Sequence, residues 1–497
     1  MKIWLDSSRT ASPVSSLCSG ACAPPSKLFT VPHTSRTEGN LIARGLRTQQ
    51  STPLHIQQLG EERWLVCNPV GAEQPAVLDT KAMTFFEQFQ MPIMASWVID
   101  TPSEAPPEAK AEAIALLLQL GLLQDLDSFT PSYTMLEPPT LAAWLHVTNA
   151  CNLRCPYCFL DKTSENMSSD TGRQAIDAIF RSALKHSMRR IRLKYAGGEP
   201  SLDMRHVTEL HDYASQLAER HSITLDDILL SNGVMLSQRA IDNLKGRQIK
   251  VMISLDGLGV YHDSQRPFIN GKGSFQYVNR TIDRLLASEL MPLISITVSQ
   301  RNLDGLVDLV EYVLERNLPF NFHYYIDNDC SAQITDLQFA EERMIATMLS
   351  AFQVIEQRLP QINFQGALVD LADMSVRHNN ICGVGQNYLV IDQFGGIAKC
   401  PIQIKDTVTT IHDEDPLQAI RDDRKGIQGL AVDEKEGCRT CDWRYWCAGG
   451  CPLLTYRATG RYDVKSPNCN IYKALFPAAL RLEALRLLQY EQPVVLC

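Results

Sequence analysis

The sequence predicts an α/β protein centred on an open, partial barrel of six strand–helix units, a (β/α)6 arrangement, with a small domain on either side. Three observations support this prediction. Strand and helix patterns alternate in order from Leu141 to about residue 360. The segment before Leu141 reads as a short run of strands followed by helices. Regular alternation stops near Cys382, where cysteines become dense.

The first 50 residues are rich in Ser, Thr and Pro, and six Lys or Arg against two Asp or Glu give them a charge of +4. They lack the apolar core of a signal peptide, so we expect a mobile arm over residues 1–50, with a transit peptide as the alternative. Residues 52–130 are expected to form a small mixed domain. Its strands would be LHIQQL, RWLVCNP and AVLDT, its helices TKAMTFFEQF and PPEAKAEAIALLLQLGLL, followed by the linker DLDSFTPSYTMLEPPT.

Residues 140–370 carry the six repeated units. Sequential strand–helix units favour a parallel sheet with helices outside, and six are too few to close an eight-stranded barrel. Active sites in such folds lie at the carboxyl ends of the strands. The expected strands are LAAWLHVT, IRLKYAGG, LDDILLSNG, KVMISLDG, PLISITVS and PFNFHYYI, with helices beginning near Thr171, His206, Ser237, Phe275, Leu303 and Asp336.

The cysteine-rich domain is expected over residues 380–475. NYLVID and GIAKCPIQ, joined by QFGG, predict a hairpin, and CRTCDWRYWCAGGC follows it. Residues 476–497 are expected to be a C-terminal helix, around ALFPAALRLEALRLLQ, and a tail.

Composition excludes several classes of function. The net charge of −9 argues against a nucleic-acid surface, and no apolar run approaches the roughly 18 residues that span a bilayer. Fifteen cysteines in a long chain without a secretion signal favour metal binding over disulfides, and we expect a cytoplasmic protein. Ten of the fifteen fall in two sets, at residues 151–158 and 382–469.

The first set, Cys151, Cys155 and Cys158 in CNLRCPYC, has the spacing C-x3-C-x2-C directly after the first barrel strand. Three thiolates can hold three corners of a 4Fe–4S cluster and leave one iron open for a ligand. A zinc site completed by a distant residue is the alternative, because thiolates suit both metals. The second strand ends in GGEP, where glycines allow close backbone approach and Glu199 can accept hydrogen bonds from an ammonium group.

CNLRCPYC, GGEP, LLSNG and SLDG, in this order over residues 140 to 360, resemble the radical S-adenosylmethionine (radical SAM) superfamily. The resemblance implies that SAM chelates the open iron and is cleaved to a 5′-deoxyadenosyl radical, which removes a hydrogen atom from a substrate carbon. It also implies the SAM contacts. Gly197, Gly198 and Glu199 would hold the methionine end, Tyr157 and Val298 would lie by the adenine, and Asn232 and Ser254 by the ribose.

The later cysteines follow the pattern C-x12-G-x4-C, then C-x2-C-x5-C-x3-C-x17-C, which resembles the SPASM extension of radical SAM enzymes that modify peptides and proteins. A zinc ribbon at Cys438 and Cys441 is the alternative. The resemblance implies two more 4Fe–4S clusters, three in all. The first auxiliary cluster would have Cys382, Cys400 and Cys451, and the second Cys438, Cys441, Cys447 and Cys469. The first would lack one cysteine, so it is open or uses Cys330, a non-cysteine ligand or substrate.

The domain over residues 52–130 resembles the small winged-helix domain that binds leader peptides of ribosomally made natural products. Recognition in that family is by strand addition to a sheet edge. A stabilising cap on the barrel is the alternative function for this domain.

These resemblances together predict a radical SAM/SPASM maturase that abstracts hydrogen from a ribosomally synthesised precursor peptide, forming a cross-link or rearranging the backbone. Its expected partners are a precursor with a leader and an electron donor such as flavodoxin or ferredoxin. A separate peptide-binding protein is a further possible partner, and neither nucleic acid nor membrane is expected. The alternatives are a side-chain maturase of the sulfatase-activating type and a non-catalytic Fe–S or zinc peptide-binding protein. The catalytic acid or base is not identified from the sequence.

Other residues receive mainly structural roles. His262, Asp263 and Arg266 follow SLDG and are expected to support the fold, with contact to SAM or substrate as the alternative. In NFHYYID, either His323 and Tyr325 or Phe322 and Tyr324 must face the barrel lumen. Four further cysteines are expected to bind no metal: Cys18, Cys22, Cys67 and Cys497.

Overall fold

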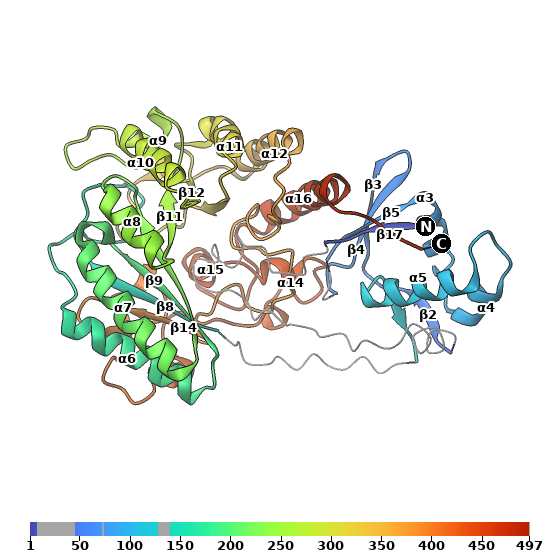
Figure 1. Ribbon diagram of the computed structural model, residues 1–497, viewed down its shortest axis with the longest axis horizontal. Coiled ribbons are helices and arrows are strands. Elements are labelled where there is room, and N and C mark those ends of the chain that lie inside the picture. Colours follow the sequence, from blue (N-terminus) through green and yellow to red (C-terminus); the bar gives the residue numbers. More distant parts are fainter. Residues whose placement is uncertain (7–44, 72–73, 128–139, 497) are drawn as a thin grey trace.

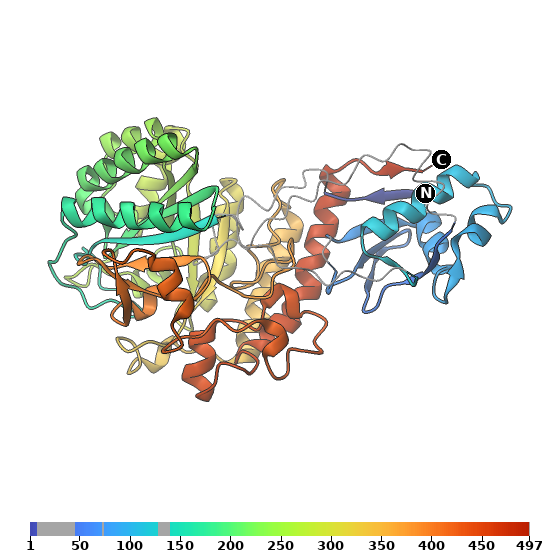
Figure 2. The same ribbon diagram turned by 90° about the horizontal axis from the view of Figure 1, so that it is seen from below.

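The computed structural model describes residues 1–6, 45–71, 74–127 and 140–496. The barrel lies at one end of an elongated molecule, the N-terminal domain lies at the other, and the cysteine-rich region lies between them (Figure 1). The long helix α16 (Cys469–Tyr490) separates this region from the N-terminal domain in both ribbon views (Figure 2).

The predicted strands form one mixed, mostly parallel sheet of nine strands, in the order β13-β12-β11-β10-β9-β8-β14-β15-β16. Apolar residues dominate the barrel strands because the sheet is covered on its outer face by helices. The edge strands β13 and β16 are not neighbours, so the sheet stays open rather than closing into a barrel. The six predicted parallel strands are β8 (Thr140–Thr148), β9 (Arg190–Gly197), β10 (Thr224–Ser231), β11 (Lys250–Ser254), β12 (Leu293–Val298) and β13 (Phe320–Tyr324).

Helices follow the strands, and three of them begin at a side-chain N-cap. The Ser168 hydroxyl accepts from the Thr171 N–H, Asp203 accepts from His206 N–H, and the Ser237 hydroxyl accepts from Ala240 N–H. A short helix in the segment after SLDG was not predicted as a separate element. The helices are α6 (Ser169–Lys185), α7 (Met204–His221), α8 (Gln238–Gly246), α9 (Val260–Gln265), α10 (Phe275–Ala287), α11 (Leu306–Glu315) and α12 (Glu341–Gln357).

The predicted hairpin is present, and it also extends the barrel sheet. Strand β14 (Tyr388–Ile391) pairs antiparallel with β15 (Gly396–Ala398) and parallel with β8, with Tyr388 opposite Ala142. The cysteine-rich region is therefore joined to the first barrel strand by backbone hydrogen bonds. Its remaining elements are β16 (Thr407–Thr410), α13 (Pro416–Asp422), α14 (Arg444–Cys447) and α15 (Pro452–Thr459).

The N-terminal domain contains a five-stranded sheet, in the order β17-β1-β5-β4-β3, and a three-stranded sheet, β6-β2-β7. The predicted strands and helices are present as β3 (His55–Gly60), β4 (Arg63–Cys67), β5 (Ala76–Asp79), α3 (Thr80–Glu87) and α5 (Pro107–Gln119). Not predicted were β1 (Lys2–Trp4), β2 (Arg47–Gln50), β6 (Ile93–Met94), α4 (Ala95–Asp100), β7 (Leu123–Asp125) and β17 (Val494–Val495).

The two ends of the predicted arm, residues 1–50, are ordered elements, which corrects the expectation of a mobile segment there. Ile3 and Trp4 in β1 are buried, and β1 pairs with β5. The other end of the segment forms strand β2. The arm's middle, residues 7–44, lies outside the described residues, as do Cys18, Cys22 and Cys497 and most of the predicted linker. The C-terminal helix begins at Cys469, and the tail ends as β17 paired with β1 rather than free.

A buried ionic cluster joins the segment after β1 to helix α16. Arg486 of α16 donates to Asp6 at 2.9 Å and to Glu483 at 2.7 Å, and all three side chains are almost completely buried. Removing the arginine would leave two buried carboxylates without a cation, which is far costlier than losing a surface pair. The termini therefore attach the N-terminal domain to α16.

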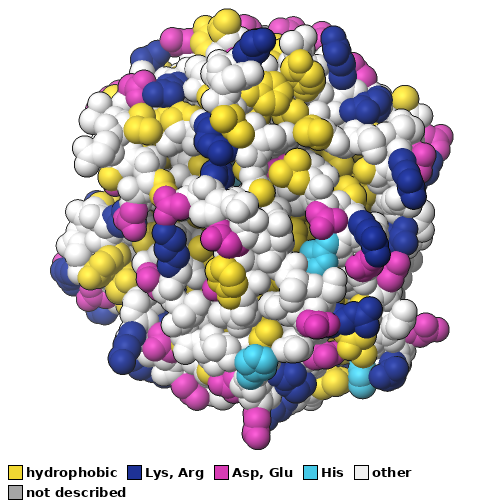
Figure 3. Space-filling model, turned by 90° about the vertical axis from the view of Figure 1, so that its left-hand side faces the viewer, with side chains coloured by type: hydrophobic (Ala, Val, Ile, Leu, Met, Phe, Trp, Pro, Cys, Tyr) yellow, Lys and Arg dark blue, Asp and Glu magenta, His cyan; other side chains and the backbone are white. Residues whose placement is uncertain are grey.

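The surface and the helices show no single dominant chemistry. Over the described residues, no helix combines the length and the apolar character that crossing a bilayer requires. Lys or Arg and Asp or Glu side chains alternate across the barrel end of the molecule (Figure 3).

Candidate active site

A cavity of about 400 Å³ lies at the carboxyl ends of the barrel strands. Its walls come from the loop after β8, from the ends of the following strands, and from the cysteine-rich region. Of the residues predicted to contact metal or SAM, the cavity wall includes Cys151, Cys155, Cys158, Tyr157, Gly197, Gly198, Glu199, Asn232, Ser254, Cys382, Cys400 and Cys451.

The three-cysteine loop follows β8 directly. It is held by backbone bonds to neighbouring segments, with Arg154 N–H donating to Pro267 carbonyl and Asn149 N–H to Glu165 carbonyl. The Lys162 ammonium lies 2.7 Å from the Cys158 sulfur. All three thiols are free of disulfides. The loop thus presents three thiols to one cavity with a cation beside one of them.

The glycines of GGEP hold the end of β9 against this loop. The Gly198 N–H donates to the Thr148 carbonyl and the Glu199 N–H to the Ala150 carbonyl, at 2.7 and 2.8 Å. A Cβ at Gly197 or Gly198 would approach these carbonyl oxygens well inside 3.0 Å, and Gly197 has φ +143°. Glycine is therefore required at both positions so that the backbone of GGEP can contact the cysteine loop, in addition to any close approach to a ligand.

Glu199 is buried and satisfied by three protein donors. Its carboxylate accepts from the Ser231 hydroxyl at 2.8 Å, Asn232 N–H at 2.7 Å and Ser201 N–H at 3.0 Å. Burial raises its pKa, and these hydrogen bonds oppose the shift. Glu199 thus links the ends of β9 and β10, and it also lines the cavity.

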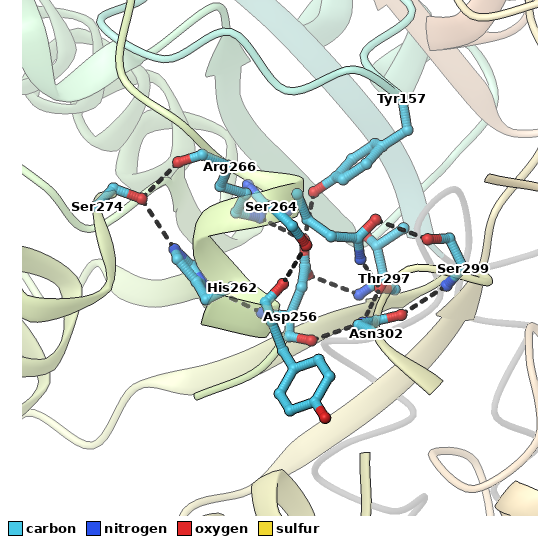
Figure 4. A network of polar contacts seen from close by, with 11 residues as sticks. Tyr157, Asp256, His262, Ser264, Arg266, Ser274, Thr297, Ser299 and Asn302 are labelled. Carbon is cyan, nitrogen blue, oxygen red and sulfur yellow. Dashed lines mark hydrogen bonds and ion pairs between the residues drawn. The ribbon is translucent and has the colours of Figure 1, made fainter. Parts of the chain in front are cut away.

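The aromatic residue of the loop is fixed by strand β11. The Tyr157 hydroxyl donates to Asp256, the Asp of SLDG, at 2.6 Å, and burial raises the pKa of the phenol. Asp256 also accepts from the Arg266 guanidinium at 2.6 Å and from Thr297 N–H at 2.9 Å (Figure 4). This carboxylate therefore connects the cysteine loop to two strands and to the segment after α9.

The segment His262 to Phe275 supports this network, as predicted. His262 is fully buried, its Nδ1 accepts from Asp256 N–H, and its Nε2 lies 3.1 Å from the Ser274 hydroxyl. Burial lowers the His262 pKa to about 4, so the ring is neutral near pH 7. Asp263 accepts from Phe275 N–H at 2.8 Å. Of the three residues predicted as structural, Arg266 alone lines the cavity.

The remaining predicted SAM contacts differ in position. Asn232 donates to the Asn152 side chain at 2.8 Å and lies on the cavity wall, as does Ser254. Val298 is fully buried and does not line the cavity, although Ser295 and Thr297 of the same strand do. Side chains alternate along a strand, so the side chain of Val298 points away from the lumen that Thr297 faces.

The seven later cysteines divide between two places. Cys382, Cys400 and Cys451 line the central cavity together with the three-cysteine loop. A separate small pocket is lined by the other four, Cys438, Cys441, Cys447 and Cys469. This division separates the cysteines into the same sets of three and four that the resemblance implied.

Burial makes these thiols hard to ionise without a cation nearby. It raises the pKa of Cys155, Cys400 and Cys447 to about 12 and that of Cys438 to about 11. A bound metal would supply the charge that favours the thiolate. In the described residues, no three His, Cys, Asp or Glu side chains converge closely enough to share one metal ion.

Cys330 does not join the first auxiliary set. Its sulfur lies 3.4 Å from the Phe159 carbonyl and from the Asp161 carboxylate, beside the first loop, and it is exposed and absent from the cavity wall. Cys67 is buried in β4. The sequence alone did not identify Asp370, which lines the cavity beside His323, with the His323 Nδ1 and Asp370 Oδ1 atoms 3.8 Å apart. Strand alternation left open which face of NFHYYID looked inward.

We expect Gly198→Ala to disrupt the three-cysteine loop. The new Cβ would collide with the Ala150 carbonyl, which is backbone and cannot turn away, at a cost of about 1–3 kcal/mol. Melting temperature and iron retained after anaerobic reconstitution should both fall. Gly246→Ala is the matched control, because a Cβ at the end of α8 meets no atom within 4 Å. Wild-type iron content and stability in Gly198→Ala would contradict this account of the loop.

A family model for the radical SAM superfamily matches residues 145–313, which run from the end of β8 through the cysteine loop to α11. The match includes the loop, GGEP and SLDG. It agrees with the resemblance carried by those motifs and with the open parallel sheet.

Three curated relatives resemble the chain in sequence. An uncharacterized protein of Methanocaldococcus jannaschii is 30% identical over 34% of this chain and 57% of its own length. AlbA of Bacillus subtilis, an antilisterial bacteriocin subtilosin biosynthesis protein, is 22% identical over 58% of this chain and 60% of its own. Mycofactocin maturase MftC of Mycolicibacterium smegmatis is 24% identical over 67% of this chain and 83% of its own. The chain thus spans less than two thirds of the first two.

The structure of anSMEcpe with bound AdoMet and Cp18Cys peptide has the same fold. It superimposes with a TM-score of 0.57 at 18% identity, over 70% of this chain and 99% of that one. The chain thus matches the radical SAM superfamily over residues 145–313, and it is similar in sequence to the bacteriocin and mycofactocin maturation proteins.

Proposed function

We propose that this enzyme modifies a ribosomally synthesised precursor peptide by abstracting hydrogen from one of its carbons. The observation that carries the proposal is the shared cavity. One chamber of about 400 Å³ is bordered by the three-cysteine loop and by Cys382, Cys400 and Cys451. A peptide residue in that chamber would lie between the site where a radical forms and a second metal site.

The residues around the loop fit a 4Fe–4S cluster with SAM. Cys151, Cys155 and Cys158 would hold three irons and leave the fourth for the methionine group of SAM. Bound together, the cluster and SAM supply an electron and a primary carbon radical. The protein's own contribution is to orient and exclude water. Glu199 and Asn232 set the wall beside the loop, and apolar side chains such as Leu230, Met252 and Ile326 line much of the rest.

The later cysteines support two auxiliary clusters, which would bring the total to three. Four thiols lining one pocket can ligate one complete cluster. The three in the central cavity would leave an iron of the other cluster open toward the substrate chamber. Because Cys330 lies beside the first loop, we assign that open position to substrate or to a non-cysteine group rather than to Cys330. An electron donor such as flavodoxin or ferredoxin would reduce the enzyme.

Two observations support a peptide substrate over a small molecule. The chain is related to maturation proteins, and anSMEcpe, which shares its fold, is described with a bound peptide. The N-terminal domain offers an open sheet edge at β3, whose Ile56 side chain is 43% exposed. The opposite edge of this sheet is β17, which has two residues and pairs with β1, so we place leader addition at β3, the longer edge strand.

Strand β3 begins beside the cysteine-rich region. The His55 ring at its start lies 5.4 Å from the Trp443 ring, two residues beyond Cys441. A leader paired with β3 could therefore extend toward the chamber.

A side-chain maturase of the sulfatase-activating type is the second candidate, favoured by the fold likeness to anSMEcpe. The N-terminal domain favours the precursor-peptide reading, because it resembles leader-binding domains, and the match to anSMEcpe covers only 70% of this chain. A small precursor encoded beside this chain would support the first candidate, and a sulfatase the second.

We expect Cys151→Ala/Cys155→Ala/Cys158→Ala to abolish 5′-deoxyadenosine formation from SAM under dithionite. The cluster that binds SAM would have lost all its protein ligands. Cys438→Ala/Cys441→Ala, which alters the other pocket, should retain part of this activity and lose peptide product. Chromatographic assay of 5′-deoxyadenosine measures both variants. Undiminished SAM cleavage in the triple variant would refute the proposed function.

We expect Ile56→Asp on the β3 edge to weaken leader binding at least tenfold. The probe is a fluorescent N-terminal fragment of a precursor encoded beside this chain. For the unmodified enzyme we expect a Kd near 1 μM, about −8 kcal/mol. Met91→Asp is the matched control, since Met91 is a more exposed apolar residue of the same domain. Equal affinity for both variants, by fluorescence anisotropy, would show that the domain serves another role, such as a cap.

A further inference from the structure

Arg266 places a buried positive charge on the wall of the central cavity. It follows α9, is 8% exposed, and lines the same chamber as the three thiols of the first loop. Burying a cation is costly unless charge and hydrogen bonds compensate it. Its partners therefore indicate what the charge does there.

Only one side of the guanidinium is used by the protein. Its Nε donates to Asp256 at 2.6 Å, and its carbon lies 5.4 Å from the centre of the Tyr157 ring (Figure 4). Within the described residues, neither terminal N–H group of Arg266 has a hydrogen-bond partner. The unused donors belong to a residue of the cavity wall, where an anion could receive them.

The position of this charge is tightly fixed. Asp256 is fully buried, and besides Arg266 it accepts from Thr297 N–H at 2.9 Å and from Tyr157 hydroxyl at 2.6 Å. Tyr157 lies between Cys155 and Cys158, so the same carboxylate holds both the arginine and the loop. Arg266 and Cys155 also interact electrostatically, the cation favouring the thiolate.

A fixed cation close to an iron–sulfur centre changes its reduction potential. Reduction adds negative charge, which a neighbouring positive charge stabilises, and the interaction is strong where water is excluded. Lys162 also lines the cavity and lies 2.7 Å from the Cys158 sulfur, but it is partly exposed, so water screens its charge more than that of the buried Arg266.

We propose that Arg266 is a positioning residue that raises the reduction potential of the cluster held by Cys151, Cys155 and Cys158, and that Asp256 tempers this effect. The inference rests on the proposed function, because it requires an iron–sulfur cluster on the loop. It assigns opposite effects to two residues in direct contact. Removing the cation should make reduction harder, and removing the anion should make it easier.

A purely structural role for the pair predicts something different. If Arg266 and Asp256 only hold Tyr157 in place, losing either would disturb the loop in the same way. The two substitutions would then lower iron content together, or shift the potential in one direction. The sign of each shift therefore separates the two roles.

The test compares Arg266→Gln, Arg266→Lys and Asp256→Asn in the full-length, anaerobically reconstituted enzyme. Redox titration followed by electron paramagnetic resonance gives the midpoint potential, and the loop cluster is the one whose signal changes when SAM is added. Arg301→Gln is the matched control, because Arg301 forms a comparable pair with exposed Asp336. Iron content is measured in every sample.

We expect the midpoint potential to fall in Arg266→Gln, to rise in Asp256→Asn, and to stay near wild type in Arg266→Lys and Arg301→Gln. Unchanged potentials in Arg266→Gln and Asp256→Asn, or shifts of the same sign, would overturn the inference. If Arg266→Gln loses its iron, Asp256→Asn decides, since only the electrostatic role predicts a rise. A wild-type loop that binds no iron would instead refute the proposed function.

Discussion

The site depends on a contact between two backbones. The end of β9 lies against the cysteine loop, with Gly198 and Glu199 donating to the carbonyls of Thr148 and Ala150. No side chain fits at the two glycines, so the sequence must supply Gly-Gly where these segments meet. This contact fixes the loop relative to the sheet. The next residue, Glu199, accepts hydrogen bonds from Ser231 and Asn232 and so joins the end of β9 to the end of β10. On the other side of the loop, the hydrogen bond from the Tyr157 hydroxyl to Asp256 holds the loop in a similar way.

The cysteine-rich region is built into the same sheet rather than appended to it. Strand β14 pairs with β8, the strand that leads into the three-cysteine loop. The hairpin that precedes Cys400 therefore lies directly beside that strand. Both cysteine sets are thereby held relative to one reference strand, which accounts for their sharing one cavity. The four-cysteine pocket lies beyond it, bordered by Trp443 and by the start of α16. The fold thus places both sets of cysteines around one chamber.

Much of this arrangement could be predicted from local patterns. The six barrel strands, the hairpin and the cysteine spacings depend on residues close in sequence, and the strands and the hairpin lie where alternation and turn residues indicated. What the sequence did not reveal depends on long-range packing. Strands β1 and β17 are three and two residues long and form because β1 pairs with both β5 and β17. The predicted contact of Val298 with adenine stays a prediction, although its side chain is buried and does not line the cavity. The contacts of Arg266 with Asp256 and Tyr157 depend on the fold, which brings the cysteine loop against this segment. Cys330, which the sequence offered as an extra ligand for the set that contains Cys382, lies instead beside the first loop.

Anomalous diffraction at the iron absorption edge, from crystals of the anaerobically reconstituted enzyme, tests the central claim most directly. The account predicts three iron centres. One would lie at Cys151, Cys155 and Cys158, one across the same cavity at Cys382, Cys400 and Cys451, and one at the separate pocket of Cys438, Cys441, Cys447 and Cys469. A zinc signal in place of iron at the first loop would contradict it, as would a central cavity bordered by a single metal centre.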